Sequence, residues 1–126
     1  MAKKIGRFLL VVLIVLAVSE AVFVYRTSFA KTEIITSASD DNSYQLIVYM
    51  IGEPEWPFGA THCRFDLFHS GKRLIKHPFS IQDDGAVAHE SNFHVTWGED
   101  HVTVIASGSE QKDKEYVLNF DGTVGQ

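Results

Sequence analysis

The longest apolar pattern in the chain lies close to its N-terminus. Phe8 to Tyr25 is a stretch of 18 positions, 13 of which are Leu, Ile, Val or Phe. A helix needs about 17–25 mainly apolar residues to cross the roughly 30 Å hydrocarbon core of a bilayer, so this stretch predicts one transmembrane helix. Glu20 is its only charged residue, and its cost of about 3 kcal/mol is smaller than the summed gain of the apolar residues.

The same segment also has the organisation of a secretory signal peptide. A basic start precedes an apolar run from Phe8 to Val18, and pairs of small residues follow at Ser19 and Ala21 and at Ser28 and Ala30. The first pair is followed by further apolar residues, which favours an uncleaved anchor. Both interpretations place the rest of the chain outside the cytoplasm, either on the plasma membrane or as a secreted protein.

The charges that flank the apolar stretch predict its orientation. Three basic residues precede it, whereas only Arg26 and Lys31 follow it closely. The positive-inside preference then places the N-terminus in the cytoplasm. The expected parts of the chain are a cytoplasmic basic segment 1–7, a signal-anchor helix 8–25, a linker 26–42 that can include a first strand at 32–36, and an extracytoplasmic β domain 43–124.

Beyond the linker, apolar and polar residues alternate with a period of two, which predicts β-strands. In the clearest hairpin, Phe93, Val95 and Trp97 alternate with polar residues before a turn at 98–100. The segment Tyr44–Ile51 is apolar on both faces, as expected of a central strand. Six or seven short strands, joined by connections too short for crossover helices, predict an all-β domain with an antiparallel meander or sandwich.

Charge and cysteine content narrow the range of partners and reactions. From Thr27 onward the chain has 7 basic and 15 acidic residues, which disfavours nucleic acid because phosphate binding requires a basic patch. Anionic lipid surfaces are disfavoured for the same reason. Cys63 is the only cysteine, so no internal disulfide can form, and its alternation with Phe65 and Leu67 predicts a buried thiol.

No catalytic arrangement is recognisable in the sequence. The chain has no nucleophile elbow, no Gly-rich phosphate loop and no cysteine pair for zinc, so we expect neither an enzyme nor a cofactor. His62, Asp66 and His94 are weak candidates for metal ligands, since a closed zinc site needs three or four converging ligands. A solvated polar face is the competing interpretation of these residues.

One loop interrupts the regular spacing of the strands. Residues 52–59 read Gly-Glu-Pro-Glu-Trp-Pro-Phe-Gly, and the two prolines stiffen the backbone around the aromatic residues. Because loops often carry recognition residues and aromatic anchors dominate interfaces, Glu53, Glu55, Trp56 and Phe58 form a candidate binding site. In the alternative, the two aromatic side chains fold back and plug an open end of the sheet.

The sequence also resembles a group of known proteins, through residues 52–59 and three shorter motifs: Asp-Asp-Gly at 83–85, Val-Thr-Trp at 95–97 and Ser-Gly-Ser-Glu-Gln at 107–111. These are small, uncharacterised membrane-anchored proteins of Gram-positive bacteria. The resemblance covers about Ser39 to Gly122 and implies an extracytoplasmic location, with no activity attached.

Two functional hypotheses arise from these observations. The first is a non-catalytic, membrane-tethered protein-interaction module of the cell envelope, including inhibitor or immunity-like roles, which contacts an envelope or extracellular protein through the Trp56 loop or an exposed sheet edge. The second is a small-ligand or metal-binding module of the cell surface.

Overall fold

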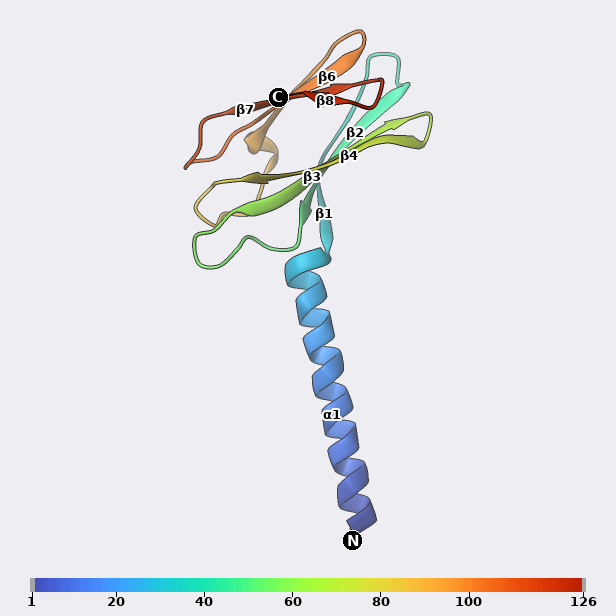
Figure 1. Ribbon diagram of the computed structural model, residues 1–126, viewed down its shortest axis with the longest axis vertical. Helices are drawn as coiled ribbons and strands as arrows, with labels where there is room; N and C mark the ends of the chain where they lie inside the picture. The colour runs from blue at the N-terminus through green and yellow to red at the C-terminus, as the bar shows by residue number, and fades with distance from the viewer. Residues whose placement is uncertain (1, 126) are drawn as a thin grey trace.

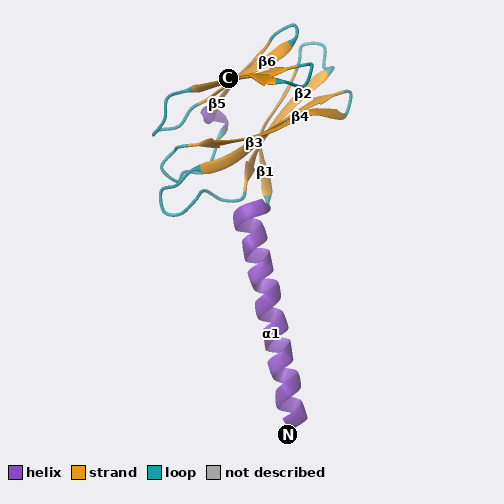
Figure 2. Cartoon of the chain, in the orientation of Figure 1, coloured by secondary structure: helices purple, strands orange, loops and turns teal. Residues whose placement is uncertain are grey.

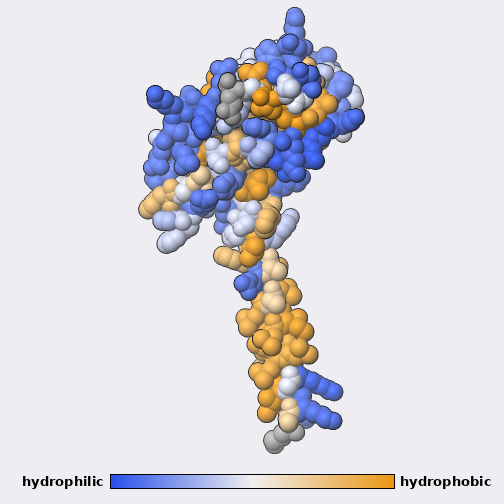
Figure 3. Space-filling view, in the orientation of Figure 1, coloured by the Kyte–Doolittle hydropathy of each residue, from blue (hydrophilic) through white to orange (hydrophobic). Residues whose placement is uncertain are grey.

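The computed structural model describes residues 2–125 and consists of a long helix with a β domain at its end (Figures 1 and 2). Helix α1 (Ala2–Val24) continues into a short π-helical turn, η1 (Tyr25–Phe29), and none of the residues in either element is buried. The helix is apolar along most of its length, whereas the visible surface of the β domain is largely hydrophilic (Figure 3). Within the described residues, this is the one helix long and apolar enough to cross a membrane. An N-terminal helix of this kind suits a membrane anchor or a signal peptide.

Eight strands form two antiparallel sheets with a shared hydrophobic core between them. The first sheet has the order β1 (Lys31–Ala38), β2 (Tyr44–Ile51), β3 (Thr61–His69) and β4 (Lys72–Ile81). The second has the order β5 (Phe93–Trp97), β6 (His101–Ala106), β7 (Lys114–Asn119) and β8 (Val124–Gly125). The prediction of an N-terminal helix followed by an antiparallel β-sandwich is confirmed.

The number of strands differs from the expected six or seven because of β8. This strand has two residues, and Val124 pairs with Leu118 of β7. A pattern of period two cannot be recognised over two residues, so only tertiary pairing identifies this strand. At the other end of the domain, β1 lies in the segment expected to be a linker and covers the strand considered at 32–36.

The core is built from the inward-facing residues of both sheets. Its fully buried apolar side chains include Leu46, Val48, Phe65, Leu67, Ile81, Val102, Val104 and Leu118. The Phe65 ring of β3 stacks on Phe79 of β4 with centroids 4.0 Å apart and meets Tyr116 of β7 edge-on at 5.2 Å. These aromatic contacts join the two sheets, since Tyr116 belongs to the second one.

Cys63 belongs to this core, so the predicted buried thiol is confirmed. Burial raises the pKa of Cys63 to about 12, because the thiolate would lose its hydration. The thiolate is the reactive form of cysteine. Cys63 is therefore a packing residue in the folded protein.

Side-chain hydrogen bonds brace the sandwich at both of its ends. At the end far from α1, Trp97 Nε1 of β5 donates to Ser37 Oγ of β1 at 2.9 Å. At the end next to α1, which we call the base, Thr61 Oγ1 of β3 donates to the carbonyl oxygen of Ala86 at 2.7 Å. The second bond fixes the connection 82–92, which runs from the first sheet to the second and includes the short 3₁₀ turn η2 (Glu90–Asn92).

Candidate binding site at the base of the sandwich

The loop that joins β2 to β3, residues 52–60, is hydrogen-bonded to the end of the helix; we call it the Trp56 loop. The backbone N–H of Glu53 donates to the carbonyl oxygen of Thr27 at 2.9 Å, and the N–H of Gly52 donates to that of Ala30 at 2.6 Å. Gly52 has a φ of 71°, and a Cβ at this position would overlap the Thr27 carbonyl. The close approach of loop and helix therefore depends on a glycine.

The Trp56 loop is also braced internally. The N–H of Glu55 donates to the carbonyl oxygen of Ala60 at 3.0 Å, and the N–H of Gly59 donates to that of Glu55 at 2.8 Å. From the neighbouring connection 82–92, the N–H of Gly85 donates to the carbonyl oxygen of Gly59 at 3.2 Å. The loop is therefore pre-organised, which lowers the entropic cost of binding.

A side-chain contact ties the Trp56 loop to the first sheet. His62 Nε2 of β3 lies 2.6 Å from Glu55 Oε1, and His62 Nδ1 lies 3.1 Å from Ser80 Oγ of β4. Both members of the His62–Glu55 pair are about half exposed, so its contribution to stability is small. Its main consequence is to position the Glu55 carboxylate against the sheet.

The aromatic residues of the loop point into solvent. Trp56 is 92 % exposed and Phe58 is 68 % exposed, and Glu53 and Glu55 are exposed beside them. The interpretation of Trp56 and Phe58 as a plug over the end of the sheet is therefore wrong. The physical reason is that the backbone bonds to the helix end and to Gly85 hold the loop outside the sandwich, while core side chains fill its interior.

Two clefts lie on either side of the Trp56 loop. The first, which we call the base cleft, has a volume of about 570 Å³, and its lining includes Arg26, Thr32, Met50, Pro54, Trp56 and Val87. The second, which we call the helix cleft, has a volume of about 880 Å³, and its lining includes Phe23, Thr27, Ile51, Trp56 and His62. Trp56 thus forms part of the wall of both clefts.

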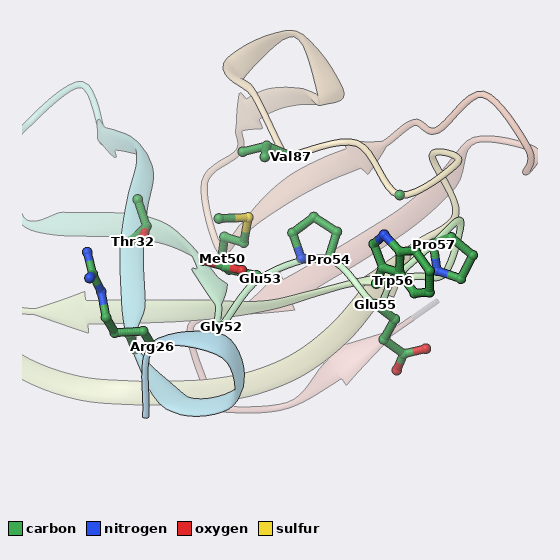
Figure 4. A pocket seen from close by; sticks show the side chains of 12 residues that line it. Arg26, Thr32, Met50, Gly52, Glu53, Pro54, Glu55, Trp56, Pro57 and Val87 are labelled. Carbon is green, nitrogen blue, oxygen red and sulfur yellow. The ribbon is translucent and has the colours of Figure 1, made fainter. Parts of the chain in front are cut away.

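The base cleft combines apolar walls with charged groups at its rim. In Figure 4, Met50 and Pro54 lie in the middle of the cleft, with Val87 from the connection 82–92 facing them. Arg26 adds one positive charge, and Glu53 and Glu55 add two negative charges. Apolar walls with a few polar groups are typical of sites that bind small molecules or peptide side chains.

The weak candidates for metal ligands do not converge. His62 is engaged by Glu55 and Ser80 on the first sheet, whereas His94 is exposed on β5 of the second. Across residues 2–125, no group of three or more His, Cys, Asp or Glu side chains is arranged to hold a metal ion.

Asp66, the third of these candidates, is not solvated. It is 1 % exposed, and Arg64 donates to both of its carboxylate oxygens from Nε at 2.8 Å and from a terminal nitrogen at 2.9 Å. A terminal nitrogen of Arg73 lies 3.7 Å from Asp66 Oδ2. Asp66 is therefore the centre of a buried ion pair, which occupies the oxygens that a metal would need.

The sequence contains little that points to the remaining residues of the base cleft. Arg26, Thr32, Met50 and Val87 lie in four separate segments of the chain, and only the tertiary structure brings them together. Comparisons of the chain with protein-family models, curated proteins and solved structures give no match.

Proposed function

We propose that this protein is a membrane-anchored, non-catalytic interaction module on the outer side of the plasma membrane, and that the base cleft with the Trp56 loop binds another protein. One observation carries the proposal: Trp56 is almost fully exposed on a loop whose backbone is fixed by hydrogen bonds. Tryptophan is enriched among the residues that contribute most to interfaces. A rigid loop presents it without a large entropic cost.

The junction between helix and domain supports an uncleaved anchor. The carbonyl groups of Thr27 and Ala30 both accept hydrogen bonds from the Trp56 loop. Cleavage after Ala30 would remove both acceptors and one wall of each cleft. The excess of basic residues before α1 supports a cytoplasmic N-terminus and an outer β domain.

The lining of the base cleft suggests the chemistry of the bound segment. The apolar walls suit an apolar side chain, and the acidic residues Glu53 and Glu55 beside Trp56 suit a flanking Lys or Arg of the partner. Complementary charges at a rim contribute mainly to specificity and to the association rate. We therefore expect the partner to present an apolar side chain next to a basic one.

Site-specific photo-crosslinking in intact cells tests the proposal. A photoreactive amino acid replaces Val87, which is half-exposed on the wall of the base cleft but does not belong to the Trp56 loop. Replacement of Lys112, which is exposed and lines neither of the two clefts, is the control. We expect position 87 to crosslink to one protein, position 112 to give no such adduct, and Trp56→Ala to abolish the adduct at position 87. The purified protein should also bind the purified partner.

Trp56→Ala suits this experiment because exposed side chains without hydrogen bonds usually change stability by less than about 0.5 kcal/mol. The variant should therefore melt at the temperature of the unmodified protein. Identical adducts from positions 87 and 112 would contradict the proposal. So would a position-87 adduct that survives in the Trp56→Ala background.

The volume of the base cleft favours a small ligand as a second candidate. About 570 Å³ lies within the range of roughly 300–1,000 Å³ that is typical of ligand sites. Native mass spectrometry of the protein, released from detergent micelles, would then show a bound small molecule that is lost in the Trp56→Ala variant. Absence of any adduct from the unmodified protein would contradict this candidate.

A further inference from the structure

The helix cleft lies between the side of the apolar helix and the Trp56 loop. One wall includes Phe23 of α1 and Thr27 of η1, and the opposite wall includes Trp56. Phe23 falls within the apolar stretch 8–25, which is long enough to cross a bilayer. In Figure 1 the connection from β2 to β3 also extends to the level at which the helix ends. Trp56 therefore lies close to the outer end of the predicted membrane span.

Several exposed apolar side chains lie at this end of the molecule. Phe58 follows Trp56 in the loop, Phe29 ends the turn after the helix with 66 % of its surface exposed, and Val87 is 48 % exposed on the wall of the base cleft. Phe29 directly follows the apolar helix, and Val87 shares the lining of the base cleft with Arg26 and Trp56. Exposed apolar groups gathered in one place mark an interaction surface.

The loop has little freedom to move away from the helix end. The bonds from Glu53 to Thr27 and from Gly52 to Ala30 connect its first residues to the last helical turn and to the residue that follows it. The bond from Gly85 to Gly59 holds its other end. When α1 spans a membrane, these bonds keep the loop beside the membrane surface.

We propose that the Trp56 loop is a second membrane contact, in which Trp56 and Phe58 enter the interfacial region of the outer leaflet. Tryptophan is enriched at this depth because its ring is apolar and its indole N–H is polar. This inference rests on the anchor role of α1 in the proposed function. It deepens that function, because the aromatic side chains then hold the base cleft at the membrane surface, where Arg26, Met50 and Val87 of its lining remain open to the protein partner. Loss of Trp56 would weaken that association by releasing the cleft from this position.

The acidic residues of the loop indicate which lipid headgroup charge the loop would tolerate. Glu53 and Glu55 are the charged residues nearest to Trp56 in the sequence, and the domain is acidic overall. A surface of anionic lipids would repel these carboxylates, whereas a zwitterionic phospholipid surface would not. The apolar insertion of the two aromatic rings therefore provides the attraction, and zwitterionic phospholipid is the expected occupant.

Tryptophan fluorescence of the full-length protein in vesicles tests this contact. The chain has two tryptophans, so Trp97→Phe leaves Trp56 alone, and Trp56→Phe leaves Trp97 at the far end of the sandwich as the control. The vesicles contain phosphatidylcholine with bromine at different depths of the acyl chain. We expect shallow bromines to quench Trp56 strongly, deep bromines to quench it weakly, and none of them to quench Trp97.

A second measurement avoids the loss of the Trp97–Ser37 hydrogen bond. In Phe58→Cys, a spin label attaches at position 58 because Cys63 is buried, and Lys112→Cys is the exposed control. The label at 58 should be more accessible to oxygen and less accessible to a water-soluble nickel complex than the label at 112. Equal accessibility at both positions, together with unquenched Trp56 fluorescence, would overturn the inference.

The outcomes also separate this inference from the anchor assignment. Extraction of the vesicles with alkaline carbonate should leave the protein in the membrane fraction, and its release would contradict the anchor itself. Retention of the protein without quenching of Trp56 would contradict only the loop contact. In cells, a photoreactive residue at position 56 that captures a protein and no lipid would assign Trp56 to a protein partner and would also overturn the lipid contact.

Discussion

The backbone N–H of Glu53 donates a hydrogen bond of 2.9 Å to the carbonyl oxygen of Thr27, a residue in the last helical turn. The final carbonyl groups of a helix lack partners within the helix. Here Glu53 of the Trp56 loop supplies a donor for the carbonyl of Thr27, and Gly52 of the same loop donates to the carbonyl of Ala30, the residue that follows the last turn. The end of the N-terminal helix and the candidate binding loop are therefore one structural unit.

Gly52→Ala should loosen this junction. Alanine at a positive φ costs about 1–2 kcal/mol, and its Cβ would also overlap the Thr27 carbonyl. Since about 1.4 kcal/mol corresponds to a factor of ten, we expect tryptic cleavage after Arg26 and Lys31 in proteoliposomes to accelerate roughly tenfold or more.

Gly71→Ala is the matched control for this change. Gly71 has a φ of 81°, but a Cβ there would meet nothing within 4 Å. It shares the backbone strain and lacks the contact with the helix. Equal cleavage rates after Arg26 in the two variants would contradict the structural role of Gly52.

The buried ion pair of Asp66 predicts different effects for its two arginines. Arg64→Met removes the bidentate partner of a carboxylate that is 1 % exposed, and it also removes a guanidinium that lies 5.3 Å from the centre of the Tyr49 ring. Breaking a buried pair costs about 3–5 kcal/mol. Arg73→Met removes a longer and more exposed contact, so its cost should stay below about 1 kcal/mol.

Urea unfolding of the protein in detergent micelles, followed by far-UV circular dichroism, measures both changes. The expected order is a large decrease in the free energy of unfolding for Arg64→Met and a small one for Arg73→Met. Similar decreases for both variants would show that Arg64 is not the principal partner of Asp66.

Cys63 should be protected from alkylation. Burial raises the pKa of its thiol to about 12, so at pH 8 the thiolate is a very small fraction and is inaccessible. Iodoacetamide should leave the folded protein unmodified and should label it completely in denaturant. The exposed thiol of Phe58→Cys serves as the positive control. Rapid labelling of Cys63 in the folded protein would show that the core opens at this position.

Asp41 should contribute to stability in a pH-dependent way. The Ser43 side chain and backbone and the Ser39 hydroxyl donate hydrogen bonds that lower the pKa of Asp41 to about 2. Since the folded pKa is lowered, the contribution is complete above the unfolded value of 3.8 and is lost as the pH falls toward 2.

Asp41→Asn should therefore melt below the unmodified protein at pH 6, and the two melting temperatures should converge near pH 2. Asp40→Asn, which changes the neighbouring carboxylate, is the control for the general effect of charge. A difference for Asp41→Asn that persists unchanged to pH 2 would assign the effect to geometry and not to ionisation.

Local patterns determined the apolar N-terminal helix and the class of fold. A run of apolar residues of this length forms a helix that can enter a bilayer whichever domain is attached to it. Alternation with a period of two decides which side chains of a strand face the core, so Phe65, Leu67 and Val104 could be assigned to the interior. Cys63 was predicted to be buried by the same pattern. These features depend only on neighbours along the chain.

Contacts between distant segments decided the rest. Whether Trp56 plugs the sandwich or faces outward depends on the partners of the loop backbone, where Glu53 bonds to Thr27 and Gly59 bonds to Gly85. The base cleft needs Arg26 and Val87 in one lining, although they are distant in the sequence. The carboxylate of Asp66 is occupied by Arg64, which sequence alone did not reveal. The periodicity of the sequence does not encode these contacts between distant segments, because they form only when the strands assemble into the two sheets. The sequence by itself thus determined an apolar N-terminal helix followed by a β domain, and the tertiary structure decided which residues line its clefts.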